Sequence, residues 1–392
     1  MSSFPTRNNT AGQRPTWAEI DRNALAANLQ IVKSHVGADV SVMAVVKANA
    51  YGHGAVECAR RLEAEGADWF GVALPEEGIE LRNAGVTKPI LCLAGFWEGQ
   101  AAACLQYKLV PAVYRFDLIE AIDSAARERG EVADVHIKID TGMGRLGVRF
   151  DEVNDFAGAL KRFKNIRVDG LMTHFAAADE PSCGPLTKDQ IRRFEHAVAV
   201  FREQGYRPSY RHLSNSAGIF AQPEASGNSD RETGANMVRP GGVLYGLWRD
   251  ILDPAHRDQE FQPVMSLHSR ITLLKWVPAG ETVGYGCTFE ASRKTLVATI
   301  PLGYDDGYMR ALSNRGHAII RGVYATVIGR ISMDLTLIDV TNVPDVQLDD
   351  RVILLGQADG LSITAEELGK IAGTLSYEVT CGVGSRVPRF FA

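Results

Sequence analysis

The run Val42-Met43-Ala44-Val45-Val46 is apolar throughout, and a helical pattern follows it at Ala55–Glu65. An uninterrupted apolar run of this kind is typical of a strand that is buried on both faces of a parallel sheet. The same succession recurs as far as residue 240. Further strand candidates are Trp69–Ala73, Ile90–Leu93, Val110–Val113, Val135–Ile139, Val168–Met172, Tyr210–Leu213 and Met237–Arg239. Eight runs separated by helical stretches predict a closed (β/α)8 barrel of the TIM type.

The character of the sequence changes after about residue 250. Short β-branched runs between Pro, Gly and Asp turn signals then predominate, which favours a mostly antiparallel β domain. The runs are Arg270–Leu274, Thr295–Ile300, Ala318–Ile320, Ala325–Ile328, Thr336–Val340 and Val352–Leu355, and a helix is expected at Ala365–Ala372. We therefore predict an α/β chain with a tail and short strand over residues 1–21, the barrel over 22–255 and the β domain over 256–392.

Composition limits the classes of function. The 392 residues carry 47 acidic and 42 basic side chains, a net charge of -5, which argues against a nucleic-acid or membrane-surface binder. The six cysteines are scattered and show no metal-ligand spacing, so we expect reduced thiols and no bound metal. Residues 1–16 lack the apolar run of a signal peptide, and no stretch suits a membrane span. A cytoplasmic protein is therefore expected.

Lys47 directly follows the first apolar run, at the barrel end where active sites lie. A lysine desolvated there would have a lowered pKa and could form a Schiff base with an aldehyde. An ordinary lysine emerging into solvent at a strand end is an equally good interpretation of its position alone. His174 follows the sixth run in the same way, as either a functional or a structural histidine.

The fifth run, Asp134–Asp140, alternates polar with β-branched residues, which places His136 and Lys138 on one face. Because the Val and Ile face suits the helix layer, Lys138 is expected to point inward and to need an anionic partner. The following glycines spell G-x-G-x-x-G at Gly142–Gly147. A dinucleotide loop should lead straight into a helix, whereas Leu146–Phe150 intervenes here, so this interpretation is disfavoured.

The last two barrel loops suit a phosphate. His212–Gly218 contains small hydroxyls, and Arg239–Gly242 ends in a Gly-Gly pair whose bare N–H groups can approach oxygens. Two ordinary Gly/Ser turns are the alternative. In the second domain, Tyr285 stands between two glycines and is free to project, although a plain hairpin aromatic is also consistent. Pyridoxal phosphate would account for the lysine, the phosphate loops and the spare acid/base groups together.

The segment Val45-Val46-Lys47-Ala48-Asn49-Ala50-Tyr51-Gly52-His53-Gly54 resembles the pyridoxal-lysine signature of the alanine racemase family. The resemblance runs in order and spacing over essentially Thr16–Arg389. It implies a barrel plus a β domain, with Thr16–Ile20 pairing into the latter, and a homodimer with shared active sites. It also implies interconversion of L-alanine and D-alanine, the latter for peptidoglycan.

The resemblance also implies residue roles. Lys47 would hold pyridoxal 5'-phosphate and act as one base, and Tyr285 from the partner subunit would act as the other. Arg239 would face the pyridine nitrogen, and His174 would lie behind the tyrosine. The remaining implied roles are phosphate binding by Tyr51, Ser216, Gly241, Gly242 and Tyr377, substrate carboxylate binding by Arg145 and by Met333 of a partner, and a carbamate on Lys138.

Two bases make physical sense, because inversion needs a proton to leave one face of the α-carbon and return on the other. Alternatives to an alanine substrate are serine or a broader range of amino acids. A barrel-type amino-acid decarboxylase is a further alternative, but the chain lacks that family's paired-glycine phosphate motif and its cysteine–acid signature.

Overall fold

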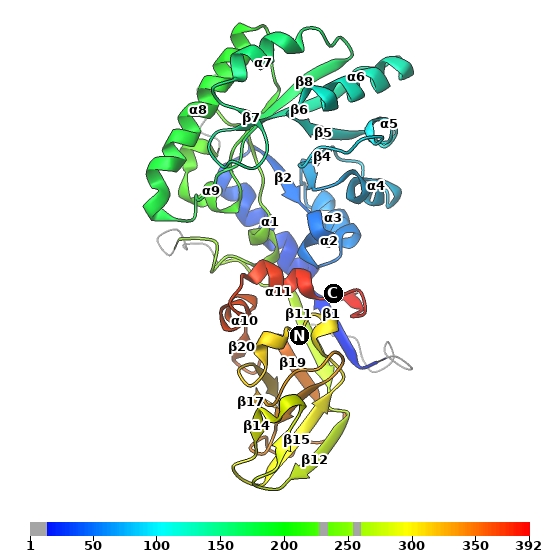
Figure 1. The fold of residues 1–392 in the computed structure, drawn as a ribbon, viewed down its shortest axis with the longest axis vertical. Coiled ribbons are helices and arrows are strands. Elements are labelled where there is room, and N and C mark those ends of the chain that lie inside the picture. Colours follow the sequence, from blue (N-terminus) through cyan, green and yellow to red (C-terminus); the bar gives the residue numbers. More distant parts are fainter. Residues whose placement is uncertain (1–13, 227–233, 254–259) are drawn as a thin grey trace. The chain divides into compact units, whose positions relative to one another are not determined.

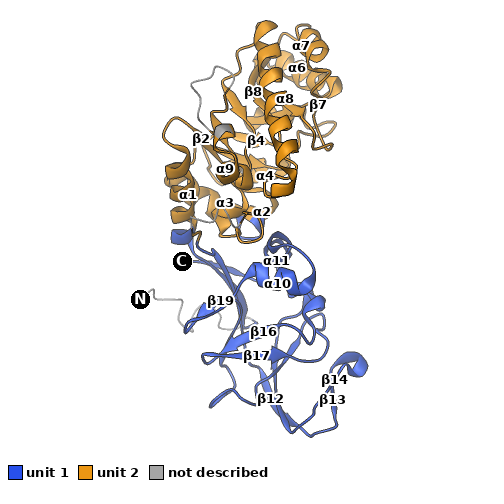
Figure 2. Ribbon diagram, turned by 90° about the vertical axis from the view of Figure 1, so that its left-hand side faces the viewer, with its two compact units in different colours: residues 1–24, 51–54, 262–392 blue, residues 25–50, 55–261 orange. Residues whose placement is uncertain are grey.

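The computed structural model describes residues 14–226, 234–253 and 260–392 (Figure 1). The chain forms two compact units (Figure 2). Unit 1 comprises residues 1–24, 51–54 and 262–392, and unit 2 comprises residues 25–50 and 55–261. The short segment 51–54 thus belongs to unit 1, although the chain on both sides of it belongs to unit 2.

Unit 2 is a closed barrel of eight parallel strands. Each strand pairs with the next, and the last pairs with the first, so the predicted (β/α)8 barrel is confirmed. The strands in order are β2 (Ser41–Val45), β3 (Trp69–Val72), β4 (Ile90–Cys92), β5 (Leu109–Val113), β6 (Ala133–Asp140), β8 (Ile166–Met172), β9 (Tyr210–His212) and β10 (Met237–Val238).

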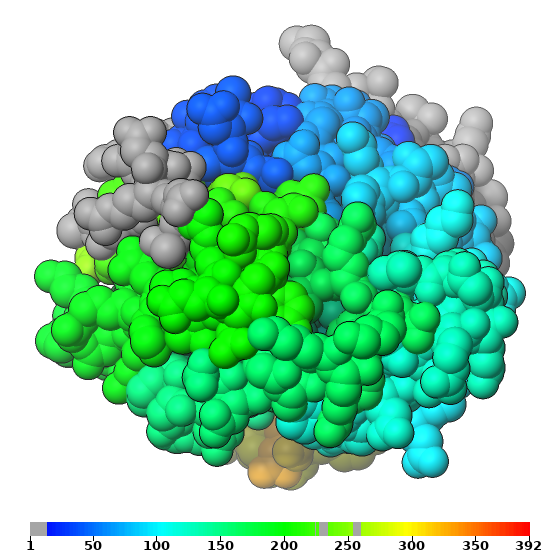
Figure 3. All heavy atoms as spheres, turned by 90° about the horizontal axis from the view of Figure 1, so that it is seen from above, coloured from blue at the N-terminus to red at the C-terminus, as the bar shows by residue number. Residues whose placement is uncertain are grey.

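Helices alternate with these strands around the barrel, from one before β2 to one before β10. In Figure 3 the chain colours pass in order from blue through cyan to green around this unit, as expected for successive β-α units. The helices are α1 (Arg22–Val36), α3 (Ala55–Ala64), α4 (Pro75–Asn83), α5 (Ala101–Gln106), α6 (Phe116–Arg129), α7 (Val153–Leu160), α8 (Gly184–Glu203) and α9 (Ser216–Ala221). The sequence patterns did not indicate α5 and α9, which are too short to show a clear helical period.

Apolar side chains from several strands fill one level of the barrel interior. Met43, Trp69, Leu91, Ala112, Met172 and Met237 form this buried cluster. Because the interior is packed at that level, polar groups nearer the strand ends have protein beneath them and can only be reached from the open end.

Unit 1 contains a ten-stranded sheet in the order β12-β15-β18-β17-β16-β19-β11-β1-β21, with β20 paired to β19. All of its pairings are antiparallel except that of β1 with β21, which confirms the predicted mostly antiparallel β domain. The strands are β1 (Thr16–Ile20), β11 (Met265–Arg270), β12 (Leu273–Val277), β15 (Thr295–Ile300), β16 (His317–Ile320), β17 (Val323–Val327), β18 (Thr336–Asp339), β19 (Arg351–Ala358), β20 (Leu361–Ile363) and β21 (Arg389–Phe391).

One predicted strand of this unit was wrong. The run Arg270–Leu274 spans the end of β11 and the start of β12, which are separate strands. Strand β11 pairs with β19, whereas β12 pairs with β15, so the backbone changes partners at Ile271 and Thr272. The predicted helix is confirmed as α10 (Ala365–Ala372), and α11 (Ser376–Gly382) follows it. No described helix has the length and apolarity needed to cross a membrane.

Candidate active site

Lys47 lies at the carboxyl end of β2, where it opens the short left-handed turn α2 (Lys47–Tyr51). All four residues of Ala48–Tyr51 have φ between 52° and 54°. This conformation costs roughly 1–2 kcal/mol for each residue other than glycine. Glu77 of α4 helps to hold the turn, because its Oε1 accepts a hydrogen bond from the backbone N of Ala48 at 2.6 Å. Strain that the surroundings enforce in this way is typical of a functional site.

Arg239 follows β10 and is buried, with a fixed guanidinium. Its Nη1 donates to Nδ1 of His212 at 2.9 Å. Its Nη2 donates to the carbonyls of Thr173 at 2.6 Å and Leu213 at 2.8 Å, and lies 3.3 Å from Nδ1 of His174. None of the described residues accepts a hydrogen bond from its Nε. Burial lowers the pKa of Arg239 to about 9, so it remains charged at pH 7, and these contacts leave its Nε–H and one Nη1–H unused.

His212 and His136 extend this arrangement across the barrel interior. Nε2 of His212 lies 2.9 Å from Nδ1 of His136. Because arginine can only donate, Nδ1 of His212 must accept from Arg239, and its proton therefore lies on Nε2. Burial, followed by the charge of Arg239, lowers the pKa of His136 to about 3 and the pKa of His212 well below its ordinary value. Both rings are therefore neutral at pH 7.

His174 is also neutral. Burial and then the charge of Arg239 hold its pKa well below the ordinary value. Its Nδ1 faces the Nη2 of Arg239, which can only donate, so the ring proton lies on Nε2. The side chain can therefore donate a hydrogen bond from Nε2 without carrying a charge.

Lys138 is buried in β6, a strand whose central residues are buried on both faces. Burial, followed by the charges of Arg239, Arg145 and Lys47 in that order, lowers the pKa of Lys138 to about 7. The described part of the chain offers no carboxylate in ion-pair contact with it. Three other cationic side chains act on Lys138, and the opposing charge of Asp140 is the smallest of the influences on its pKa, so the described residues leave an excess of positive charge that suits an anionic ligand.

The predicted phosphate loops meet at Ser216 and Gly241. The backbone N of Gly241 donates to Oγ of Ser216 at 2.9 Å, which joins the loop after β9 to the loop after β10. A short 3-10 turn, Gly242–Tyr245, begins directly afterwards. The side chain of Asn215 caps α9 by accepting from the N of Gly218 at 2.9 Å. The structure therefore brings together the small hydroxyl and the Gly-Gly backbone that the sequence singled out.

Arg145 is exposed in the glycine-rich loop after β6. Oδ1 of Asp140 accepts from the backbone N of Gly142 at 3.0 Å and of Gly144 at 3.1 Å, which folds the loop back on itself. The loop leads into the short strand β7 (Val148–Arg149), which pairs with β6. It therefore returns to the sheet instead of opening a helix, and it lacks the geometry of a dinucleotide loop.

In unit 1, Tyr51 and Tyr377 pack edge to face, with ring centroids 5.3 Å apart and planes inclined by 62°. The neighbouring Gly52 has φ +87°, and a Cβ there would lie 2.1 Å from the carbonyl O of Thr380 in α11. A side chain at position 52 would therefore force the segment away from α11. Burial, followed by the proximity of Cys381, raises the pKa of Tyr51, so its hydroxyl stays protonated as a donor.

Two further predicted site residues project from unit 1. Tyr285 is 72% exposed, between Gly284 and Gly286, which have φ of +78° and +71°. Because φ at Gly286 is positive, a residue with a side chain would be strained there, so this loop favours glycine. Met333 is 51% exposed.

The residues that sequence reasoning missed are His212 and Thr173, which bond Arg239 directly. The available signal was their position, since both follow or end an apolar run at the active end of the barrel. His136 was placed on the same face as Lys138, but its contact with His212, 76 residues away, left no trace in the local pattern.

Comparison with known proteins gives a consistent result. A family model described as "Alanine racemase, N-terminal domain" matches residues 20–248, and one described as "Alanine racemase, C-terminal domain" matches residues 264–391. The chain belongs to the alanine racemase family. The alanine racemase of Symbiobacterium thermophilum is 42% identical over 97% of this chain and 98% of its own length, and that of Citrifermentans bemidjiense is 43% identical over 95% and 97%.

Solved structures of the alanine racemase family share the fold. Alanine racemase from Clostridium difficile 630 has a TM-score of 0.87 at 36% identity, with 96% of each chain covered. A crystal structure of alanine racemase from Bacillus anthracis with bound L-Ala-P has a TM-score of 0.87 at 30% identity, covering 97% of this chain and 95% of that one.

Proposed function

We propose that the protein interconverts L-alanine and D-alanine with pyridoxal 5'-phosphate as its cofactor. The observation that carries this proposal is the group of cations Lys47, Lys138, Arg145 and Arg239 at the open end of the barrel, where the hydrogen bonds that fix the guanidinium of Arg239 do not use its Nε–H. Full-length similarity to alanine racemases supports the choice of substrate. A cytoplasmic homodimer that supplies D-alanine for peptidoglycan is part of the same proposal.

The residues present fit this cofactor. Lys47 would hold its aldehyde carbon, and Nε of Arg239 would donate to its ring nitrogen. The phosphate would be bound by Ser216, Gly241 and Gly242, together with the hydroxyls of Tyr51 and Tyr377. When bound, pyridoxal phosphate supplies an electron-accepting ring that makes the α-proton of the attached amino acid acidic.

Arg239 controls the charge at the ring nitrogen. With a pKa of about 9 it stays protonated at neutral pH, and it donates a hydrogen bond instead of transferring a proton. A pyridine nitrogen facing such a donor remains neutral. We expect a less stabilised carbanion at the α-carbon and, as a consequence, fewer transamination side reactions.

Proton transfer at the α-carbon needs a base on each face. We assign Nζ of Lys47 to one face and the phenolic oxygen of Tyr285 from a partner subunit to the other. A tyrosine has an ordinary pKa of about 10, so its anionic form needs a neighbouring donor. Nε2 of His174 carries a proton and is suited to that task, while Arg145 and Met333 are assigned to the substrate carboxylate.

Lys138 would supply the missing anion beside Arg145. Its pKa of about 7 leaves a large share of neutral amine at physiological pH. Neutral Nζ can attack the carbon of CO2 and release one proton, which yields a carbamate with a negative charge. The burial that lowers the lysine pKa is thus the feature that makes the modification accessible at neutral pH.

A chiral product assay on a panel of L-amino acids tests the proposal. The purified holoenzyme should convert L-alanine into D-alanine until both are equal, and should release no CO2. A larger rate with L-serine would favour a serine or broad-specificity racemase. Release of CO2 without a D-amino acid would support the barrel-type decarboxylase and overturn the proposal.

A further inference from the structure

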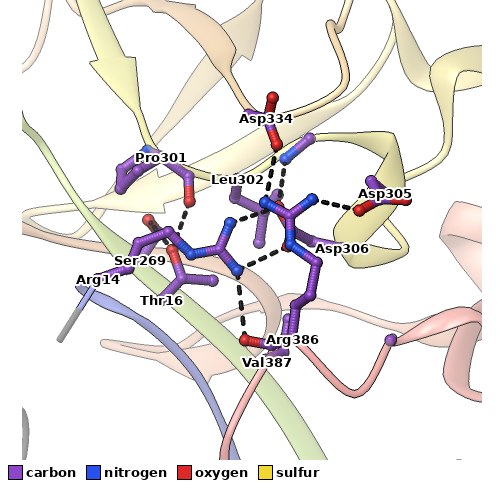
Figure 4. A network of polar contacts seen from close by, with 12 residues as sticks. Arg14, Thr16, Ser269, Pro301, Leu302, Asp305, Asp306, Asp334, Arg386 and Val387 are labelled. Atoms are coloured by element: carbon purple, nitrogen blue, oxygen red, sulfur yellow. Dashed lines mark hydrogen bonds and ion pairs between the residues drawn. The ribbon is translucent and has the colours of Figure 1, made fainter.

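A cluster of charged side chains in unit 1 has no part in the proposed chemistry. Asp306 is 0% exposed and receives both arms of Arg14, with Nη1 to Oδ2 at 2.8 Å and Nη2 to Oδ1 at 2.6 Å (Figure 4). Its Oδ2 also accepts from the backbone N of Gly303 at 3.0 Å. A buried carboxylate is costly unless it is paired and hydrogen-bonded, and this one is satisfied on both oxygens.

Arg386 extends the cluster toward the residue after Met333. Its Nη1 pairs with Asp305, its Nη2 donates to Oδ1 of Asp334 at 2.7 Å, and its Nε lies 3.5 Å from Oδ1 of Asp306. Figure 4 shows this guanidinium between the three carboxylates. One side chain thus connects the turn that contains Asp305 with the loop that contains Asp334.

Backbone hydrogen bonds join the same two segments next to Met333. The N of Asp305 donates to the carbonyl of Met333 at 3.1 Å, and the N of Tyr304 donates to the carbonyl of Ser332 at 3.0 Å. The approach is so close that a Cβ at Gly303 would lie 2.3 Å from the carbonyl O of Met333. The place of Met333 is therefore set by the turn, and the turn is held by Arg14 and Arg386.

The ion pairs of Arg386 are partly exposed to solvent. The side chain of Arg386 is 42% exposed, and its partners Asp305 and Asp334 are 51% and 56% exposed. Exposed ion pairs of this kind contribute little to stability, because water and salt screen them. Three partners on one planar guanidinium instead fix its orientation, because its N–H donors are held in a rigid plane.

We propose that Arg386 is a positioning residue, which holds Met333 in place for the substrate through Asp305, Asp306 and Asp334. The inference rests on the proposed function, in which Met333 contacts the substrate carboxylate. Such a contact is made equally before and during proton transfer. Its loss should therefore weaken binding of alanine without slowing the chemical step.

The test is steady-state kinetics of the holoenzyme in both directions. We expect Arg386→Met to raise KM about 10-fold for L-alanine and D-alanine, with kcat changed less than about 3-fold. Arg386→Lys, which keeps the charge but not the fork, should show an intermediate KM. Arg293→Met is the matched control, because it removes one partly exposed ion pair, to Asp339 at 3.1 Å, in the same unit.

Cofactor content and melting temperature distinguish a positioning role of Arg386 from general damage to the folded enzyme. Both should be the same in Arg386→Met, Arg293→Met and the unmodified enzyme. An unchanged KM in Arg386→Met, or a rise in KM matched by a loss of bound cofactor and of melting temperature, overturns the positioning role. An unmodified enzyme that does not racemise alanine overturns the proposed function instead, so the two failures are distinguishable.

Discussion

Nη1 of Arg239 donates to Nδ1 of His212 at 2.9 Å inside the barrel, in a pair that joins the loop after β10 to the end of β9. Since His212 is bonded in turn to His136, two buried histidines from different strands help to fix one guanidinium. The arrangement leaves neither ring charged, and the hydrogen bonds that fix the guanidinium use Nη1 and Nη2 and not Nε. His212 is thus a positioning residue for the arginine that would face the cofactor.

His212→Phe should lower kcat/KM for alanine about 10- to 100-fold, because it leaves a hydrogen bond to a charged group unmade, worth about 1.5–3 kcal/mol. His212→Asn retains an acceptor and should recover part of the loss. The matched control is His268→Phe, which removes a buried histidine beside Arg351 in unit 1. Equal effects of the two phenylalanine variants would contradict the assignment.

Lys47→Ala should abolish covalent attachment of the cofactor and lower racemisation at least about 100- to 10,000-fold, the usual contribution of a general base. The measurement is borohydride reduction of the holoenzyme, followed by peptide mass mapping. The adduct is expected on Lys47 in the unmodified chain and on no lysine in the variant. Lys164→Ala is the surface control, and an adduct on any other lysine would contradict the assignment.

Tyr285→Phe should remove exchange of the α-proton from one enantiomer while leaving it for the other. The reason is geometric, because the phenol serves one face of the α-carbon and Lys47 serves the opposite face. Single-turnover uptake of solvent deuterium from L-alanine and from D-alanine measures each face separately. Equal loss from both enantiomers would argue against a one-face role, and Tyr324→Phe provides an exposed tyrosine as control.

Carbamate formation on Lys138 should increase between pH 6 and pH 8. Burial lowers the pKa of Lys138 to about 7, and only the neutral amine present above that pKa reacts with CO2. Carbon-13 NMR with labelled bicarbonate should show a carbamate signal that grows with pH and is missing from Lys138→Ala. A spectrum without such a signal at any pH in this range would refute the modification.

Gly147→Ala should destabilise the protein more than Gly144→Ala. Both glycines have positive φ, of +132° and +71°, so each substitution should cost about 1–3 kcal/mol of backbone strain. A Cβ at Gly147 would also lie 2.5 Å from the N of Asp140, whereas nothing lies within 4 Å of a Cβ at Gly144. The difference in melting temperature between the two variants measures the effect of the clash at position 147. Equal melting temperatures would show that the loop moves aside to relieve it.

Much of the architecture could be read from local patterns. Several barrel strands are short apolar runs, and Val42–Val46 and Val168–Met172 differ from β2 and β8 by one or two residues at an end. The strand ends carry Lys47 and Arg239, so the barrel rule alone placed both at the active end. Patterns failed where an element is short, as in α5, or where two strands share one apolar run, as at Arg270–Leu274.

The spacing of apolar residues and the position of a residue at a strand end are set by residues close together in the sequence. For that reason the amino-acid order alone specified the barrel, the β domain and the place of Lys47 at the end of a barrel strand. The partners of each polar group are a different matter. His136 and His212 are 76 residues apart, Arg14 and Arg386 are 372 apart, and Tyr51 meets Tyr377 only because residues 51–54 join unit 1. Strand register and packing bring these groups into contact, so only the folded chain decided which side chains are neutral, which are charged and which partners each donor meets.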